Sequence, residues 1–180
     1  MKIFLIGFMG SGKTHWGRLL SAKLRLPFSD LDTVIVEKEK KTVSELFSEK
    51  GEEYFRYQEK EVLEEIIGSQ ESFILSCGGG TPCFFNNIEL MKKNGKVVWL
   101  NTAIDVLQER LLKERMSRPL IREIGDDELR RYIARKLSER KMYYEQADVM
   151  VNEESVSLEQ LILLLFEEEK ERDRMRDDDL

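Results

Sequence analysis

The sequence contains one histidine, two cysteines and three prolines among its 180 residues. Because His15 is the single histidine, histidine-based catalytic triads and histidine-ligated zinc sites are very poor explanations of its function. Cys77 and Cys83 supply neither a disulfide framework nor a four-cysteine zinc site, and they fit free thiols in a reducing cytosol. We therefore expect a cytoplasmic protein without structural disulfides.

Long apolar runs are also missing. No run approaches the roughly 20 residues that a helix needs to span a bilayer. The first residues, MKIFLIGFM, resemble the apolar part of a secretory signal, but they run into Lys13 without a small-residue cleavage pattern. We expect neither export nor a membrane partner.

Positive charge is in the minority, with 29 basic against 35 acidic residues and a net charge of −6. Eight acidic and four basic residues fall in the last fourteen, so residues 167–180 form an acidic tail, expected to be a solvated helix end. Nucleic acid is not an expected partner, because its binding needs a basic surface. Residues 1–166 are nearly balanced in charge and long enough to bury the core of a single domain.

Short apolar runs alternate with helical patterns along this body. Strands are expected at 2–6, 27–31, 72–76, 96–100 and 147–151, and helices at 13–24, 42–51, 52–67, 86–95, around 104–111, around 129–137 and at 157–166. Such alternation predicts an α/β fold with a parallel sheet and helices on both faces. The charged segment 116–127 contains a proline and a glycine, and it predicts an exposed, mobile lid.

The strongest motif lies between the first strand and the first helix. Residues 7–14, GFMGSGKT, match the phosphate-binding pattern G-x-x-x-x-G-K-[ST]. Its glycines let backbone N–H groups approach an anion at the positive end of a helix. Lys13 can reach the phosphates of ATP and Thr14 can offer its hydroxyl to Mg²⁺, while His15 contributes at most its backbone N–H. The expected nucleotide contacts are Gly10, Ser11, Gly12, Lys13, Thr14 and His15.

Other motifs favour a small kinase among phosphate-loop proteins. The D-x-x-G and [NT]-K-x-D motifs of GTPases are absent from the sequence. Asp30 and Asp32 end the second expected strand, where one carboxylate can serve Mg²⁺ and the other a substrate hydroxyl; a helix cap or a surface pair is the alternative. The third expected strand is followed by three glycines, Gly78, Gly79 and Gly80. They indicate either close backbone approach to a ligand or a flexible turn.

Taken in order, these motifs resemble the shikimate kinase family. The matching segments are GFMGSGKT, SDLD, EYFRYQE, SCGGGTP, RPL and ERKMYYEQAD, and they cover about residues 1–152. The resemblance implies a fold like that of nucleoside monophosphate kinases, with five parallel strands in the order 2-3-1-4-5, a mobile lid at about 116–127 and substrate-binding helices at about 33–67. It also implies transfer of the ATP γ-phosphate to the 3-hydroxyl of shikimate, with Mg²⁺, in aromatic amino-acid biosynthesis.

The resemblance assigns roles residue by residue. On the nucleotide side, Thr14 and Asp30 match the metal site, and Lys13 and Arg118 match the side chains that neutralise the transferring phosphate. Arg110 corresponds to the arginine that stacks on adenine, although it lies one residue further from Arg118 than is usual, and the stretch NEESVS lacks an arginine that some relatives place near adenine.

On the acceptor side, Asp32 matches the acid that holds the substrate's hydroxyls. Arg56 and Arg140 match the pair that clamps the shikimate carboxylate, beside the loop of Gly78, Gly79 and Gly80. Two arginines can fork onto a planar carboxylate and orient it, which a lysine would not do. We expect Lys13, Asp32 and Arg118 to be the catalytic residues, in a chain that acts as a monomer.

Two rival functions stay open from the sequence. Another small-molecule kinase, such as a gluconate kinase, would share the phosphate loop, but it would not need Arg56 and Arg140 beside three glycines. A binding or regulatory module without transfer activity would not need Lys13, Asp32 and Arg118 together. An assay with several acceptors separates all three.

Overall fold

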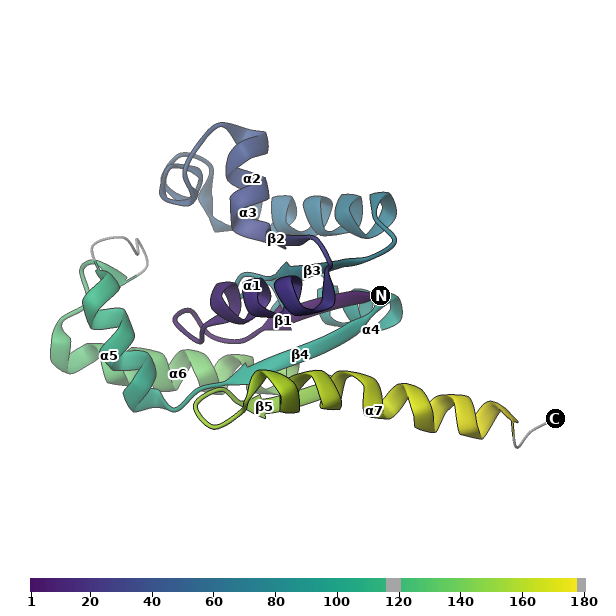
Figure 1. Ribbon diagram of the computed structural model, residues 1–180. Coiled ribbons are helices and arrows are strands. Elements are labelled where there is room, and N and C mark those ends of the chain that lie inside the picture. Colours follow the sequence, from purple (N-terminus) through teal and green to yellow (C-terminus); the bar gives the residue numbers. More distant parts are fainter. Residues whose placement is uncertain (116–120, 178–180) are drawn as a thin grey trace.

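The structure, a computed structural model, describes residues 1–115 and 121–177, with side chains described as far as residue 167 (Figure 1). At its centre lies one sheet, made of β1 (Lys2–Ile6), β2 (Phe28–Asp30), β3 (Phe73–Ser76), β4 (Lys96–Asn101) and β5 (Val149–Asn152). The strand order is β2-β3-β1-β4-β5, and every pairing is parallel. This confirms the predicted α/β fold and its strand order.

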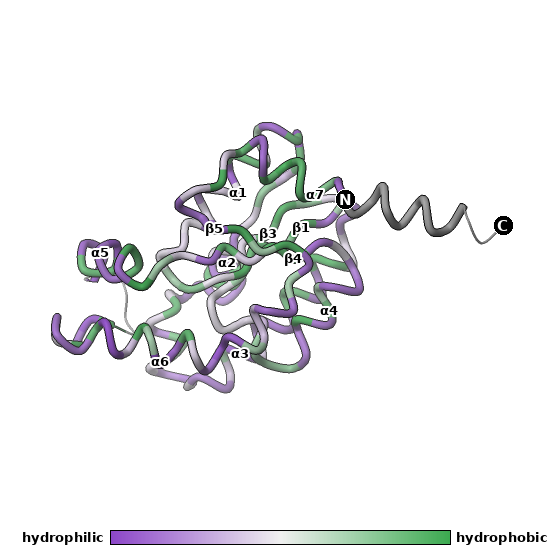
Figure 2. Tube along the Cα trace, turned by 90° about the horizontal axis from the view of Figure 1, so that it is seen from below, coloured by the Kyte–Doolittle hydropathy of each residue, from purple (hydrophilic) through white to green (hydrophobic). Residues whose placement is uncertain are grey.

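Helices cover both faces of the sheet. One face carries α1 (Lys13–Leu24) and α7 (Leu158–Asp177), and the other carries α2 (Leu31–Glu39), α3 (Val43–Ser69), α4 (Asn87–Asn94) and α6 (Asp126–Tyr144). A further helix, α5 (Ile104–Glu114), packs against α6 in a small separate cluster that includes Phe8 of the phosphate loop. In Figure 2 the hydrophobic strands lie inside and the hydrophilic positions gather on the surrounding helices.

The central strand shows why the sheet needs both layers. Successive strand side chains point to opposite faces. Ile3 and Leu5 of β1 therefore join the core under α1 and α7, while Phe4 and Ile6 join the core under α2, α3 and α4. All four side chains are fully buried, as the uninterrupted apolar run predicts.

The edge strand β5 differs from the predicted pattern. Val149 and Val151 are buried, but Met150 is 61% exposed, so only one side of this strand packs against the core. The expectation of strands buried on both faces is wrong here, because no helix covers the outer side of this last strand within the described part of the chain.

Helix α3 contains a sharp kink, which the sequence anticipated as two helices. Thr42 and Glu45 form the expected capping box at its start, with the Glu45 N–H 3.2 Å from the Thr42 hydroxyl and the Thr42 N–H 2.7 Å from the Glu45 carboxylate. At Gly51 the backbone leaves the helical region, with φ 83° and ψ 170°, before the helix resumes at Glu52. This left-handed φ suits glycine and strains other residues.

Two predicted boundaries need correction. The second strand stops at Asp30, and Asp32 lies in the first turn of α2, because Asp30 caps that helix and accepts a hydrogen bond from the Thr33 N–H at 3.4 Å. The predicted lid 116–127 is less exposed than expected from its middle onward, since Ile121 is fully buried and α6 begins at Asp126. Residues 116–120 lie outside the described residues.

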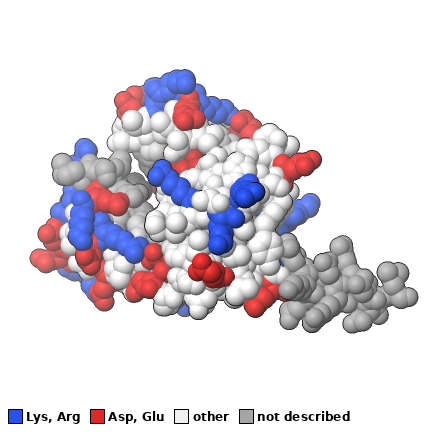
Figure 3. Space-filling model, in the orientation of Figure 1, with Lys and Arg blue, Asp and Glu red and all other residues white. Residues whose placement is uncertain are grey.

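The C-terminal helix α7 is longer than its apolar pattern, running from Leu158 to Asp177 and past the rest of the body (Figure 1). Figure 3 shows Lys and Arg side chains intermixed with Asp and Glu side chains over the face seen there, as the near-balanced charge of residues 1–166 predicts. Among the described residues, no helix is long and apolar enough to cross a membrane.

Candidate active site

The phosphate loop joins β1 to α1 at the carboxyl edge of the sheet. Gly10 and Gly12 have φ values of 81° and 85°, a left-handed conformation that favours glycine. The N–H of Ser11 bonds the Phe8 carbonyl at 3.1 Å and closes the turn, and α1 begins directly afterwards at Lys13. The N-terminus of α1 therefore faces the enclosed space with its backbone N–H groups, as anion binding requires.

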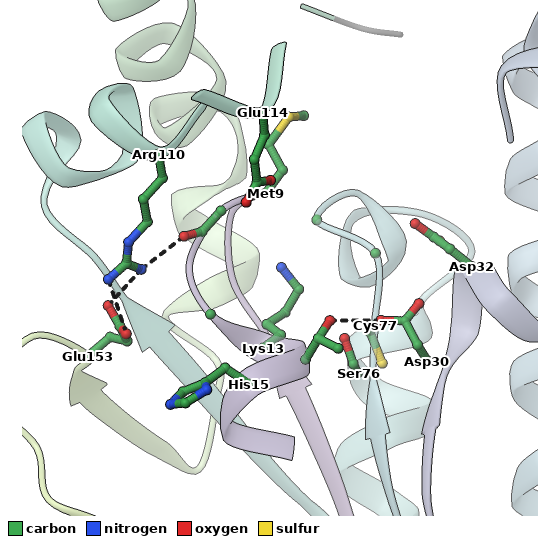
Figure 4. Close-up of a pocket in the computed structure, with 15 residues that line it drawn as sticks. Met9, Lys13, His15, Asp30, Asp32, Ser76, Cys77, Arg110, Glu114 and Glu153 are labelled. Atoms are coloured by element: carbon green, nitrogen blue, oxygen red, sulfur yellow. Dashed lines mark hydrogen bonds and ion pairs between the residues drawn. The ribbon is translucent and has the colours of Figure 1, made fainter. Parts of the chain in front are cut away.

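Lys13 is held within its own loop. Its Nζ donates to the carbonyls of Gly7 and Phe8, at 2.9 and 2.8 Å. Figure 4 shows the side chain reaching into the middle of the cavity, between the phosphate loop and Asp30 and Asp32. The ammonium group thus lies where a phosphate would meet it, already ordered by hydrogen bonds.

Thr14 and Asp30 come together as the sequence predicted. The Thr14 hydroxyl donates to Asp30 Oδ2 at 3.3 Å, which joins the first turn of α1 to the end of β2. Both side chains line the cavity, together with Asp32. Hydroxyl and carboxylate oxygens are the ligands that Mg²⁺ prefers.

Asp32 has the most unusual environment of the acidic residues in the cavity. Its Oδ1 atom is buried and makes no hydrogen bond. Burial, and secondarily the carboxylates of Glu59 and Asp30, raises the pKa of Asp32 from an ordinary 3.8 to about 7. A buried carboxyl oxygen without a partner has a large energetic reason to accept a hydrogen bond from a ligand.

Arg56 is buried on α3 between two glutamates. Its Nη1 bonds Glu59 Oε2 at 2.6 Å, and its Nη2 bonds Glu52 Oε1 at 3.0 Å. Glu59 is 1% exposed, also accepts a hydrogen bond from the Thr81 hydroxyl, and has its pKa raised by burial. Sequence reasoning missed Glu59, although its place three residues after Arg56 on a helix predicts a pair.

The three glycines after β3 pack directly on charged side chains. A Cβ atom on Gly78 would lie 2.6 Å from Glu59, one on Gly80 would lie 2.7 Å from the Arg56 guanidinium, and one on Gly79 would lie 3.0 Å from Arg140 Nη1. At Gly78 and Gly80 a side chain would require Glu59 or Arg56 to move, and at Gly79 it would press on Arg140. The predicted close approach of this backbone to a ligand stays a prediction, while the structure shows close approach to the arginines and Glu59 of the site itself.

Arg140 lies at this loop from the side of α6. Its guanidinium lies 5.4 Å from the centre of the Phe8 ring, and Tyr144, one turn later on α6, donates its hydroxyl to the Gly79 carbonyl at 2.6 Å. The buried Tyr144 thus fixes the middle of the glycine loop against the helix that carries Arg140.

The far end of the cavity is closed by an ion pair that the sequence did not predict. Arg110 Nη1 lies 3.0 Å from both the Gly10 carbonyl and Glu153 Oε2, and Glu153 also accepts from the Trp16 indole at 3.3 Å. Arg110 lines this end of the cavity, whereas the exposed His15 points away from Asp32 (Figure 4). Glu153 stands in the stretch that lacks the relatives' arginine.

Lys13, Thr14, Asp30, Asp32 and Arg110 open on one cavity of about 410 Å³. It is lined by Met9, Gly10, Gly12, Lys13, Thr14, His15, Asp30, Asp32, Ser76, Cys77, Gly78, Gly79, Arg110, Glu114 and Glu153. Arg56 and Arg140 are not among these residues, and they reach the glycine loop from α3 and α6. Ser11 is fully buried in the loop, and Arg118 lies outside the described residues.

The described residues hold no cluster of three or more histidine, cysteine or acidic side chains suited to a metal. The oxygen donors that line the cavity still fit Mg²⁺. This ion keeps several waters and is usually bound by one or two carboxylates together with substrate phosphates. Thr14, Asp30 and Asp32 are lining residues whose side-chain oxygens suit that purpose.

Comparison with known proteins decides between the rival kinases. A family model described as "Shikimate kinase" matches residues 9–168. The chain belongs to the shikimate kinase family. Shikimate kinases transfer the γ-phosphate of ATP to the 3-hydroxyl of shikimate with Mg²⁺, and this is the reaction of the chain.

Individual shikimate kinases resemble the chain over most of its length. One from Azobacteroides pseudotrichonymphae is 43% identical over 149 residues, which are 83% of this chain and 88% of that protein. The crystal structure of one from Bacteroides thetaiotaomicron has a TM-score of 0.85 at 40% identity, covering 94% of this chain and 98% of that one. Another, from Acinetobacter baumannii in complex with shikimate, has a TM-score of 0.82 at 28% identity, covering 92% of both chains.

Proposed function

We propose that the cavity between the phosphate loop and the glycine loop performs this phosphoryl transfer, with the nucleotide at the Arg110 end and the acceptor at the Asp32 end. The observation that carries the proposal is the shared cavity of Lys13 and Asp32, with a buried oxygen of Asp32 left without a partner. A phosphate-neutralising cation and an acceptor-binding carboxylate thus face the same space. Phosphoryl transfer depends on such positioning more than on covalent chemistry.

On the nucleotide side, Lys13 leaves the carbonyls of Gly7 and Phe8 and binds the phosphates. Thr14 and Asp30 would hold Mg²⁺, which when bound supplies positive charge against the phosphate oxygens. Arg110 provides a flat guanidinium for the adenine ring, and Arg118 is proposed to reach the phosphates from the lid segment.

On the acceptor side, Asp32 accepts a hydrogen bond from the 3-hydroxyl of shikimate and aligns that oxygen with the phosphate. A pKa of about 7 also suits Asp32 to take the proton near neutral pH. Arg56 and Arg140 bind the carboxylate at the opposite end of the ring, and the glycine loop 78–80 allows the acceptor to lie close to the backbone.

An acceptor panel tests this proposal. Purified protein, ATP and Mg²⁺ are incubated with shikimate, gluconate or nucleoside monophosphates, and ADP release is followed by a coupled assay. We expect turnover with shikimate that stops when Mg²⁺ is removed, and background rates with the other acceptors. Turnover with gluconate but not shikimate, or with no acceptor in the panel, would overturn it.

We further propose that the protein acts as a monomer in the cytoplasm. The sequence has no long coiled-coil heptad pattern that would pair two copies. Cys77 and Cys83 are free thiols, as is usual in a reducing compartment. Light scattering during size-exclusion chromatography tests the first statement and cell fractionation tests the second.

A further inference from the structure

The guanidinium of Arg56 lies close to other groups on three sides. Glu59, 1% exposed, binds Nη1 at 2.6 Å. The Phe84 ring lies 4.8 Å from the guanidinium carbon, and the backbone of Gly80 is so close that an added Cβ would come within 2.7 Å. Arg56 itself is 6% exposed, so its plane and position are set by the fold.

The fourth side of this guanidinium is held quite differently. Nε and Nη2 both donate to one oxygen of Glu52, at 3.1 and 3.0 Å. These two nitrogens form an edge of the guanidinium that can bind a carboxylate through two parallel hydrogen bonds. The Glu52 side chain is 59% exposed, so it can swing away from Arg56 into solvent without disturbing the core.

We propose that Glu52 is an internal competitor for the acceptor's carboxylate. It occupies the Nε–Nη2 edge of Arg56 while the acceptor site is empty, and it gives up that edge when shikimate binds. This inference rests on the proposed function, because it requires Arg56 to hold the carboxylate of the acceptor.

Competition follows from charge. Two carboxylates at one guanidinium edge would repel each other within a few ångström, where the protein screens charge less than water does. A displaced Glu52 still has a favourable position for its negative charge, because it is the first residue of the helix that resumes after Gly51. A negative side chain is stabilised at a helix N-terminus and by the surrounding water. Glu52 therefore keeps the charge of Arg56 compensated in the empty site and lowers the affinity for shikimate.

The central variant is Glu52→Gln, which removes the competing charge and keeps the size of the side chain. We expect shikimate to bind about two- to five-fold more tightly by calorimetry, as the loss of a half-exposed ion pair implies. Affinity for ATP should not change. The matched control is Glu53→Gln, an exposed neighbour with the same charge. It should bind shikimate like the parent protein.

Two further measurements show that the effect passes through Arg56. In the double variant Glu52→Gln with Arg56→Ala, the gain from Glu52→Gln should vanish. A cyclohexene triol like shikimate but without the carboxylate should bind the parent protein and Glu52→Gln equally well.

Each contrary result has its own meaning. Weaker shikimate binding by Glu52→Gln would make Glu52 a support of Arg56 and overturn the inference, and so would unchanged binding. Equal tightening by Glu52→Gln and Glu53→Gln would show that net negative charge near the site lowers the affinity, without any contact with Arg56, and would overturn the inference. The proposed function fails separately, if Arg56→Ala binds shikimate as tightly as the parent protein does.

Discussion

Asp32 illustrates how burial gives a common side chain its chemistry. Its pKa of about 7 lies above the ordinary 3.8, so the folded protein holds a proton on Asp32 over a pH range in which the unfolded chain does not. Stability must therefore fall as the pH rises through this range, because the folded state increasingly carries an uncompensated buried charge. The same environment suits Asp32 to accept a hydrogen bond or a proton from a ligand hydroxyl near neutral pH.

Replacement of Asp32 should separate stability from activity. We expect Asp32→Asn to lose turnover and to be more stable than the parent protein, with an advantage that grows by about 2–3 kcal/mol from about pH 5 to pH 8. Urea unfolding of both proteins at the two pH values measures this. An advantage that is constant or shrinks with pH would show that the carboxyl is not held protonated by its surroundings.

The pH profile of the reaction offers a second test at this residue. Only ionised Asp32 can accept both the hydrogen bond and the proton of the 3-hydroxyl, so kcat/KM for shikimate should decline as the pH falls below about 7. Initial rates at low shikimate concentration, with saturating ATP and Mg²⁺, give the profile. A flat profile down to about pH 5 would remove Asp32 from this role.

Lys13 should matter for turnover and not for folding. Lys13→Ala loses the charge that faces the developing phosphate charge, and we expect turnover to fall about 100-fold or more. Lys23→Ala, an exposed change on the same helix, is the control and should turn over normally. Near-normal turnover of Lys13→Ala would refute the assignment of the phosphate loop.

At the scale of elements, the loop after β3 is made of glycines because side chains of neighbouring helices fill the space around it. The positive φ values among glycines occur at Gly7, Gly10, Gly12 and Gly51, so residues 78–80 are not glycines for backbone freedom. They are small because Glu59, Arg140 and Arg56 occupy the space that side chains would take. The loop therefore marks where α3 and α6 approach the proposed acceptor end of the cavity.

A single methyl group in this loop should therefore disturb acceptor binding. Gly80→Ala places a Cβ against the Arg56 guanidinium, and we expect shikimate affinity to fall about ten-fold or more while ATP affinity stays the same. Gly68→Ala, where nothing lies within 4 Å of the new atom, is the matched control. Calorimetry on both variants decides the matter, and unchanged shikimate binding by Gly80→Ala would contradict the proposed location of the acceptor carboxylate.

At the scale of the whole molecule, the buried hydrophobic side chains form separate packing clusters. The sheet with its two helical layers forms a rigid frame, whereas α5 and α6 share a small cluster around Phe8 and Ile121 at one end of the site. The segment between these two helices is the predicted lid. The middle of this segment is anchored by the buried Ile121, so closure is expected to pivot there.

Amide hydrogen exchange should detect this closure. We expect slower exchange across residues 116–127 when ADP and shikimate are both bound, because Arg118 gains phosphate partners only in the closed form. Arg118→Ala should lose turnover and most of that protection while still binding shikimate. Equal exchange in the free and doubly liganded protein, with normal turnover of Arg118→Ala, would show that the segment is not a lid.

Patterns in the sequence predicted the sheet and the phosphate loop, and the family resemblance predicted the strand order. These depend on local patterns: apolar runs of strand length, a glycine-rich turn before a helix, and a capping box at Thr42. The resemblance also predicted the roles of Asp30, Asp32, Arg56 and Arg140.

Only the tertiary structure decided how these residues are held. The pKa of Asp32 depends on burial beside Glu59, and the engagement of Arg56 by Glu52 depends on a kink at Gly51 that sets where the helix restarts. The Arg110–Glu153 pair joins residues 43 positions apart. Burial and the Arg110–Glu153 contact arise from the packing of whole elements, so no local pattern in the sequence could state them. The Glu52–Arg56 contact joins residues four apart on one helix, a spacing that the sequence shows, and the structure adds the burial of Arg56.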